Sequence, residues 1–103
     1  MLNQELGLPA VPPAPRQFVR RLASDLELSD ETRRRAERLA KRAEEHGMAN
    51  GRNPAGVAAG CLYEAARENG GEVTQTELGE CADVSPMTVR KRWQEVQEIL
   101  HEM

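Results

Sequence analysis

The chain has 103 residues and a formal net charge of −3, which is the size of a single small domain. Alanine (13 residues) and leucine (10 residues) dominate its apolar side chains, whereas isoleucine occurs once and aromatic residues three times. Strands favour β-branched and aromatic residues, and helices favour alanine, leucine, glutamate and arginine. The composition therefore excludes an all-β fold and disfavours an α/β fold. The acidic balance, taken alone, argues against a nucleic-acid partner.

The N-terminal segment carries no signal for export or for a membrane. No apolar run approaches the roughly 18–20 residues that span a bilayer, and the basic-then-apolar order of a signal peptide is missing. We therefore expect a cytoplasmic protein without a membrane partner. Residues 9–15 contain four prolines, which favour an extended chain, and residues 2–8 are long enough for one short helical turn. We expect a flexible tail or linker over 1–13 and a helical domain over 14–103.

The first two helices are predicted from the spacing of their apolar residues. The first runs over about 15–26, with Phe18, Val19, Leu22 and Leu26 on one face. The second opens at Ser29, a favourable N-cap, and Gly47 ends it. Its inner stripe is formed by small and apolar side chains: Thr32, Ala36, Leu39, Ala40 and Ala43.

The outer faces of this second helix are rich in arginine. Residues Arg33, Arg34, Arg35, Arg38 and Arg42 alternate with glutamates. The simplest interpretation is a solvated face with i,i+4 ion pairs such as Glu37–Lys41. A dedicated basic binding patch is the alternative.

The third predicted helix differs in kind from the others. Asn53 and Pro54 provide an N-cap and a first helical residue, and residues 55–66 (AGVAAGCLYEAA) hold a single charged side chain. A helix that is apolar all round belongs in the middle of a domain. Gly56 and Gly60 share one face of it, so another helix backbone can approach closely there.

The segment TQTELGECADVSPMTVRKRW at 74–93 predicts a helix-turn-helix motif. Thr74 and Glu77 fit a capping box at the start of a short fourth helix that ends near Ala82. Asp83 tolerates a left-handed turn better than most residues. Ser85 then caps a fifth helix that runs to about Leu100, so the motif covers 74–100.

The fifth helix presents polar and basic residues opposite its predicted core stripe of Val89, Trp93, Val96 and Leu100. A helical wheel places Met87, Lys91 and Gln94 directly outward and Thr88 and Arg90 on the flanks. Arg92 lies nearer the core edge.

This pattern suits a helix that reads DNA in the major groove. Arg90 can bond guanine O6 and N7 together, and Met87 can pack on thymine methyl groups. Phosphate or groove contacts fall to residues at the helix starts and on the outer face: Thr74, Gln75, Thr76, Thr88, Lys91 and Gln94.

Enzymatic and metal-binding roles find little support. His46 and His101 are isolated from other metal ligands, and no nucleophile has a base nearby in sequence. Cys61 and Cys81 form no CxxC pair. Two buried, reduced thiols are expected, with a raised pKa for Cys61, and one bridge between the two cysteines is the alternative. We expect no enzyme activity, no metal and no cofactor.

Residues 29–32, 51–66 and 74–93 together resemble the second cyclin-like repeat of archaeal transcription factor B, the counterpart of eukaryotic transcription factor IIB. The resemblance covers about 14–100. It implies an all-α, five-helix cyclin-like bundle around a buried third helix, with the last two helices reading an element upstream of the TATA box. The base-reading positions fall on Met87, where the family commonly has valine, and on Arg90.

The resemblance also implies partners: promoter double-stranded DNA, the TATA-binding protein, and RNA polymerase through parts of the family's proteins that this sequence lacks. It implies an archaeal cell and association with the nucleoid. We expect a fragment or a solitary repeat that binds DNA weakly alone. Arginine supplies 12 of the 14 basic residues, which suits a salt-loving archaeon. Two alternatives remain: a small helix-turn-helix regulator, and a cyclin-like protein-interaction module.

Overall fold

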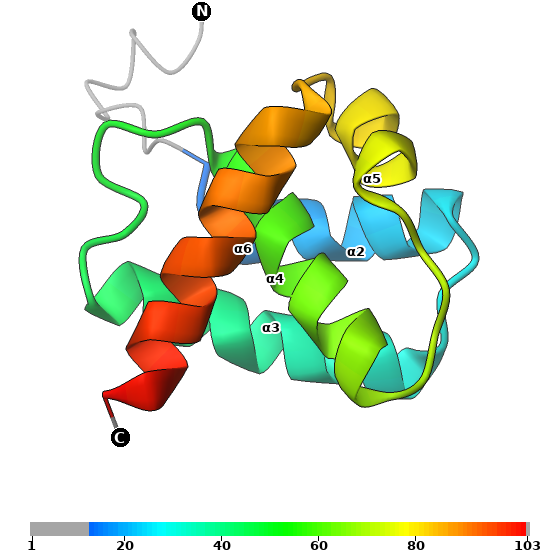
Figure 1. Cartoon of the computed structure of the whole chain (residues 1–103), viewed down its shortest axis with the longest axis horizontal. Helices are drawn as coiled ribbons and strands as arrows, with labels where there is room; N and C mark the ends of the chain where they lie inside the picture. Colours follow the sequence, from blue (N-terminus) through cyan, green and yellow to red (C-terminus); the bar gives the residue numbers. More distant parts are fainter. Residues whose placement is uncertain (1–12, 103) are drawn as a thin grey trace, which may run out of the picture.

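A computed structural model describes residues 13–102, which form five α-helices and no strand (Figure 1). The helices are α2 (Pro15–Asp25), α3 (Asp30–Glu45), α4 (Pro54–Glu68), α5 (Gln75–Ala82) and α6 (Pro86–His101). The predicted all-α class is confirmed. The predicted turn at 2–8 and nearly all of the predicted tail at 1–13 lie outside the described residues.

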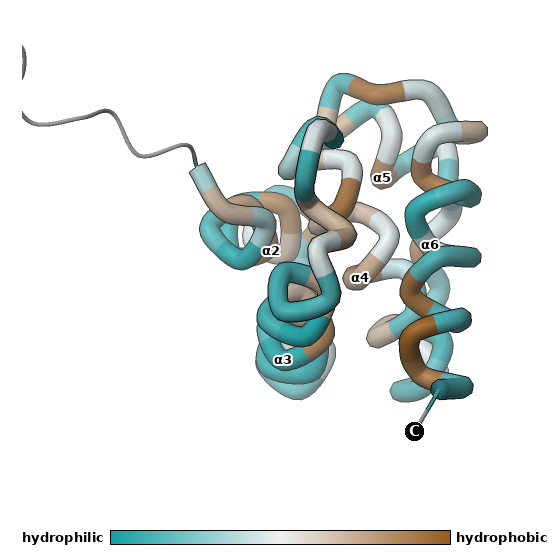
Figure 2. Tube along the Cα trace, turned by 90° about the vertical axis from the view of Figure 1, so that its left-hand side faces the viewer, coloured by the Kyte–Doolittle hydropathy of each residue, from teal (hydrophilic) through white to brown (hydrophobic). Residues whose placement is uncertain are grey.

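Helix α4 is the centre of the bundle. In Figure 2, α2 and α3 lie on one side of α4 and α6 lies on the other side. Every residue of α4 from Ala55 to Leu62 is buried. This confirms the expectation from its apolar sequence, because a helix without a polar face is stable only where protein surrounds it.

Helices α2 and α3 cover α4 with their apolar stripes. All five stripe residues predicted for α3 are buried. In α2, Val19 and Leu22 are buried, while Phe18 and Leu26 are only partly buried and pack against the core. Leu26 is the C-cap of α2 and not part of its last turn.

Local hydrogen bonds fix the helix ends where the sequence predicts them. The Ser29 hydroxyl accepts from the Thr32 backbone N–H at 3.1 Å, and Asn53 Oδ1 accepts from the Ala55 backbone N–H at 2.9 Å. Gly47, just beyond the end of α3, has φ +74°, which glycine adopts without a steric penalty. The bounds of α3 and α4 therefore follow from their caps.

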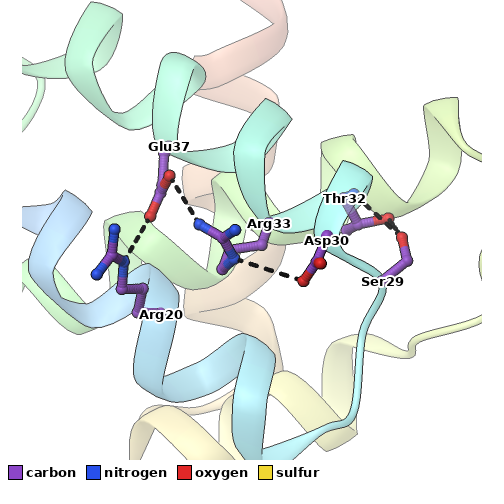
Figure 3. Close-up of polar contacts among 6 residues, drawn as sticks. All are labelled: Arg20, Ser29, Asp30, Thr32, Arg33 and Glu37. Atoms are coloured by element: carbon purple, nitrogen blue, oxygen red, sulfur yellow. Dashed lines mark hydrogen bonds and ion pairs between the residues drawn. The ribbon is translucent and has the colours of Figure 1, made fainter.

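The exposed charges of α3 pair differently from the prediction. Glu37 Oε1 accepts from Arg33 Nη1, and Glu37 Oε2 accepts from Arg20 Nε of α2, each at 3.2 Å (Figure 3). The predicted Glu37–Lys41 pair is wrong, because both carboxylate oxygens are taken by guanidinium groups. Within residues 13–102, Lys41 makes no ion pair.

Candidate nucleic-acid interface

The first helix of the predicted motif, α5, begins with a complete capping box. Thr74 Oγ1 accepts from the Glu77 backbone N–H at 3.0 Å, and Glu77 Oε1 accepts from the Thr74 backbone N–H at 2.9 Å. Two backbone donors at the helix start are therefore satisfied by side chains. Thr74 and Thr76 are exposed and Gln75 is half-buried, so the start of α5 is open to a ligand.

The turn between α5 and α6 is tight and depends on two residues. Asp83 has the left-handed conformation that the sequence predicts, with φ 61° and ψ 44°. The Val84 N–H donates to the Gly79 carbonyl at 2.9 Å. A Cβ at Gly79 would lie 2.6 Å from the Val84 carbonyl oxygen. The need for glycine at position 79 is not among the sequence predictions above, which place only the end of this helix near Ala82.

Helix α6 begins at a serine cap, as predicted. Ser85 Oγ accepts from the Thr88 backbone N–H at 3.1 Å, and the two hydroxyl oxygens lie 3.0 Å apart. The Thr88 side chain is half-buried, with its hydroxyl at this cap. Of the predicted phosphate contacts on α6, Thr88 is therefore the one already engaged within the protein.

The outward face of α6 carries the predicted base-reading residues. Met87 is 64% exposed, the largest hydrophobic side chain left in solvent among the described residues. Arg90, Lys91 and Gln94 are exposed as well. The structure thus brings Met87 and Arg90 together on the N-terminal half of α6, next to the exposed start of α5.

The inward face of α6 differs from the prediction near its end. Val89, Val96 and Ile99 are buried, whereas Trp93 and Leu100 are only partly buried. Ile99 replaces Leu100 in the core.

A backbone contact with α4 holds α6 in position. A Cβ at Gly60 would lie 2.7 Å from Arg92 Cβ and 2.8 Å from the Trp93 backbone nitrogen, so only glycine fits there. Gly56, one turn earlier, is less crowded, with Thr88 Cγ2 at 3.4 Å from an added Cβ. The close approach predicted for this face of α4 is confirmed, and it holds the middle of α6 against α4.

Comparison with known proteins identifies the family. Residues 11–99 match the family described as the transcription factor TFIIB repeat. The chain belongs to this family. It is 45% identical over 93 residues to transcription initiation factor IIB 1 of Halobacterium salinarum, covering 90% of this chain and 32% of the relative.

Further relatives support the same assignment. Transcription initiation factor IIB 2 of Haloferax volcanii is 43% identical over 96 residues, which cover 93% of this chain and 29% of the relative. Transcription initiation factor IIB of Archaeoglobus fulgidus is 39% identical over 99 residues, which cover 96% of this chain and 30% of the relative. The chain therefore spans about a third of the length of the curated relatives it matches. The family consists of transcription factors and not of enzymes, as the sequence predicts.

In this TFIIB repeat, Trp93 anchors the middle of α6 to α4. Its indole Nε1–H donates to Glu64 Oε1 at 2.8 Å, and its ring meets Tyr63 edge to face with centroids 5.0 Å apart. Arg67 completes the cluster, with Nη1 3.2 Å from the same Glu64 oxygen. Glu64 is buried, and these two donors satisfy its charge. No pattern within α4 or α6 alone predicts this contact between Trp93 and Glu64.

Arg92 anchors the same helix on the loop side. Its side chain is 16% exposed, and its Nε lies 3.4 Å from Glu95 Oε1, within ion-pair distance although without hydrogen-bond geometry. Glu95 Oε2 accepts from Arg52 Nη2 at 3.0 Å, and Arg52 Nη1 donates to the Met48 carbonyl. The loop before α4 is thereby tied to α6. Arg92 lies at the core edge, as predicted, and does not belong to the outward face of α6.

Both cysteines of the repeat are free thiols. Burial, together with the nearby charge of Glu44, raises the pKa of Cys61 to about 12, in line with its place in the central helix. Cys81 is only half-buried, contrary to prediction, and its thiol lies 3.6 Å from Asp25 Oδ2. Burial and this hydrogen bond also raise the pKa of Cys81.

No helix within 13–102 has both the length and the apolar character needed to cross a bilayer. The same residues contain no group of three or more histidine, cysteine or acidic side chains arranged to hold a metal ion.

Proposed function

We propose that this TFIIB repeat is a DNA-binding unit of a general transcription initiation factor. It reads a promoter element upstream of the TATA box and acts with the TATA-binding protein in assembling the preinitiation complex. One observation carries the proposal: in a chain of this family, Met87 and Arg90 are exposed together at the N-terminal half of α6, the part of a recognition helix that meets base edges.

Each proposed contact follows from the chemistry of its side chain. The Arg90 guanidinium bonds guanine O6 and N7, and Met87 packs on a thymine methyl group. Lys91 and Gln94 contact the backbone beside α6. Thr74, Gln75 and Thr76 bring hydroxyl, amide and backbone N–H groups to phosphates at the start of α5. Thr88 contributes through the cap that it forms with Ser85.

The partners are proposed at the level of the whole factor. This chain engages promoter DNA and the TATA-binding protein, whereas RNA polymerase is engaged by parts of the factor outside this repeat. The protein works at the nucleoid of an archaeal cell. Because one helix-turn-helix makes few phosphate contacts, the isolated repeat binds DNA weakly and the TATA-binding protein strengthens the complex.

A gel-shift titration tests the proposal, using promoter DNA with the TATA-binding protein at several salt concentrations. Arg90→Ala should weaken binding by about 1–3 kcal/mol and relax the preference at one base pair. Lys91→Ala should weaken binding to all sequences evenly. It should also reduce the salt slope, which is the slope of log K against log salt concentration, by about one.

Lys41→Ala is the matched control, because it removes one lysine charge on α3, across α4 from α6. It should leave both affinity and salt slope unchanged. If Arg90→Ala and Lys91→Ala both bound the promoter as tightly as the unmodified chain, the assignment of α6 as the reading helix would be wrong. An inverted-repeat site bound by a stable dimer would favour a regulator instead.

A further inference from the structure

A second charged surface lies on the side of the molecule away from α6. Helices α2 and α3 enclose a groove of about 730 Å³. Five cations line it, with Glu37 as the single carboxylate: Arg16, Arg20, Arg34, Arg38 and Lys41. On a chain with a net charge of −3, this is a local excess of positive charge that a solvated, mixed-charge helix face would not produce.

Most of these cations make no ion pair with any described residue, although Arg34 and Arg38 also line a neighbouring hollow that contains Glu31 and Glu68. Glu37 is already engaged by Arg20 and by Arg33, which lies outside the groove (Figure 3). Within residues 13–102, the side chains of the other four lining cations make no ion pair. A concave surface with several unpaired cations concentrates its field on an anionic ligand. The groove is therefore electrostatically suited to a partner that carries several negative charges.

The cations are arranged in two facing rows. Arg16 and Arg20 lie one turn apart on α2, while Arg34, Arg38 and Lys41 lie on successive turns of α3. The two helices run antiparallel, since Arg20 meets Glu37 and the Arg16 backbone N–H meets Glu44. Side chains at i, i+4 and i+7 of a third helix also follow one another at about one helical turn, which rises about 5.4 Å. Carboxylates along one face of such a helix could therefore pair with the cations of α2 on one side and with those of α3 on the other.

The shape of the groove favours a protein segment over a DNA duplex. A third helix, about 10–12 Å across with its side chains, packs over the groove between two helices whose axes lie about 8–10 Å apart, whereas a duplex is wider and meets such a surface only at its backbone. Helix α4 also lies between α2 and α6, while α3 contacts both α4 and α6 (Figure 2). Arginine, which supplies four of the five cations, bonds a carboxylate through two parallel N–H groups.

We propose that the α2–α3 groove is a docking site for an acidic helical segment of a partner protein. Carboxylates along one face of that segment pair with Arg16, Arg34 and Arg38. This site is separate from the DNA-reading surface, and it stands or falls independently of the function proposed above.

Fluorescence anisotropy with a defined probe tests the proposal. The probe is a labelled, alanine-based helical peptide of about 20 residues with glutamates at i, i+4 and i+7 along one face. The matched control peptide has the same composition with its glutamates spread around the helix. The chain should bind the one-faced peptide about tenfold more tightly, or better, because only that arrangement reaches both rows of cations.

Two double variants, each lacking two positive charges, locate the site. Arg34→Ala/Arg38→Ala should weaken binding of the one-faced peptide by about tenfold or more, whereas Arg90→Ala/Lys91→Ala should change it by less than about twofold. Far-UV circular dichroism checks that both variants are folded. Equal binding of the two peptides, or equal losses in the two variants, would overturn the proposal.

A charge exchange removes any dependence on how well the alanine variant folds. Arg34→Glu/Arg38→Glu should lose the glutamate peptide and gain binding of the same peptide with lysine in place of glutamate. If the charge exchange gained no lysine-peptide binding, the groove would not be the docking site. If Arg34→Ala/Arg38→Ala instead weakened binding to a duplex without a promoter element, the groove would be a DNA contact and the proposal would be wrong.

Discussion

At the residue scale, neighbours in sequence have unrelated tasks. Arg90, Lys91 and Arg92 form one basic run, yet the first two are exposed and the third is 16% exposed beside Glu95. The difference follows from the helical repeat, since each successive residue is turned by about 100° around the axis. The side of the helix on which each residue lies therefore distinguishes the candidate DNA contacts Arg90 and Lys91 from the packing residue Arg92.

The Cys61 thiol predicts how stability depends on pH. Burial raises its pKa in the folded chain from 9.0 to about 12. Between these values the unfolded chain releases the thiol proton and the folded chain keeps it, so alkaline pH favours unfolding. The contribution of Cys61 is complete below pH 9 and should fall by about 1.4 kcal/mol per pH unit above it.

Urea unfolding at pH 8 and at about pH 10.5 measures this effect. Cys61→Ala removes the thiol, so this variant should lose less stability than the unmodified chain on going to the higher pH. Cys81→Ala is the comparison variant, because Cys81 is half-buried and retains partial access to water. Identical pH dependence in the unmodified chain and in Cys61→Ala would contradict the prediction.

At the element scale, the contact between α4 and α6 determines where α6 lies. Gly60 allows the backbone of α6 to approach α4 so closely that an added Cβ would lie 2.7–2.8 Å from three of its atoms. Two of those atoms are main-chain atoms of Arg92 and Trp93, which cannot rotate away. The helix position is therefore fixed by backbone contact more than by side-chain packing.

Gly60→Ala should consequently destabilise the chain by about 1–3 kcal/mol, because α6 must shift to make room. Gly56→Ala is the control in the same helix and on the same face. Its new methyl group would meet Thr88 Cγ2 at 3.4 Å, an ordinary contact, so this variant should be at least as stable as the unmodified chain and up to about 1 kcal/mol more stable, because alanine favours a helix over glycine. Chemical denaturation compares the two, and equal stability would rule out the close contact.

Elements with caps and stripes are predictable from this sequence, and long-range polar partners are not. Ser29, Thr74 and Ser85 cap helices where predicted because their hydrogen bonds are local. Gly79 was missed because its need for a hydrogen in place of a side chain arises from Val84 across the turn. Pairs such as Trp93–Glu64 and Arg20–Glu37 join separate helices, and no periodicity within one segment encodes them.

In the candidate site, too, the local features were predictable from the sequence and the long-range contacts were not. The helical wheel placed Met87 and Lys91 outward and Arg90 on a flank, and all three are exposed because exposure on a helix is periodic. It placed Leu100 inward, where the structure buries Ile99, because the last turn meets fewer neighbours and its orientation depends on the bundle. The bases proposed as their contacts belong to a partner molecule, so no pattern within this chain predicts them.

At the scale of the whole molecule, two positive surfaces are separated by one buried helix. The first is the outward face of α6 and the second is the α2–α3 groove, with α4 lying centrally in the bundle (Figure 2). The net charge of −3 hides both surfaces, since it sums over residues that no single partner contacts. Charge counted by face, and not in total, indicates what such a protein binds.

This separation predicts that the two ligands bind independently. The affinity of the one-faced glutamate peptide should change by less than about twofold when promoter DNA and the TATA-binding protein are present at saturation, because no shared residue links the sites. Anisotropy of the labelled peptide with and without the DNA complex measures this. A large change in affinity would show that the two surfaces are coupled through α4 or overlap in the assembled complex.

The use of glycine in α4 has a consequence for how this protein can evolve. Because the support of α6 comes from the buried backbone beside Gly60, the exposed residues Met87 and Arg90 contribute little to folding stability. Substitutions there can change the proposed DNA contacts while the bundle stays intact. Duplicated copies of such a gene could therefore acquire different promoter preferences through one or two surface mutations, with no compensating change in the core.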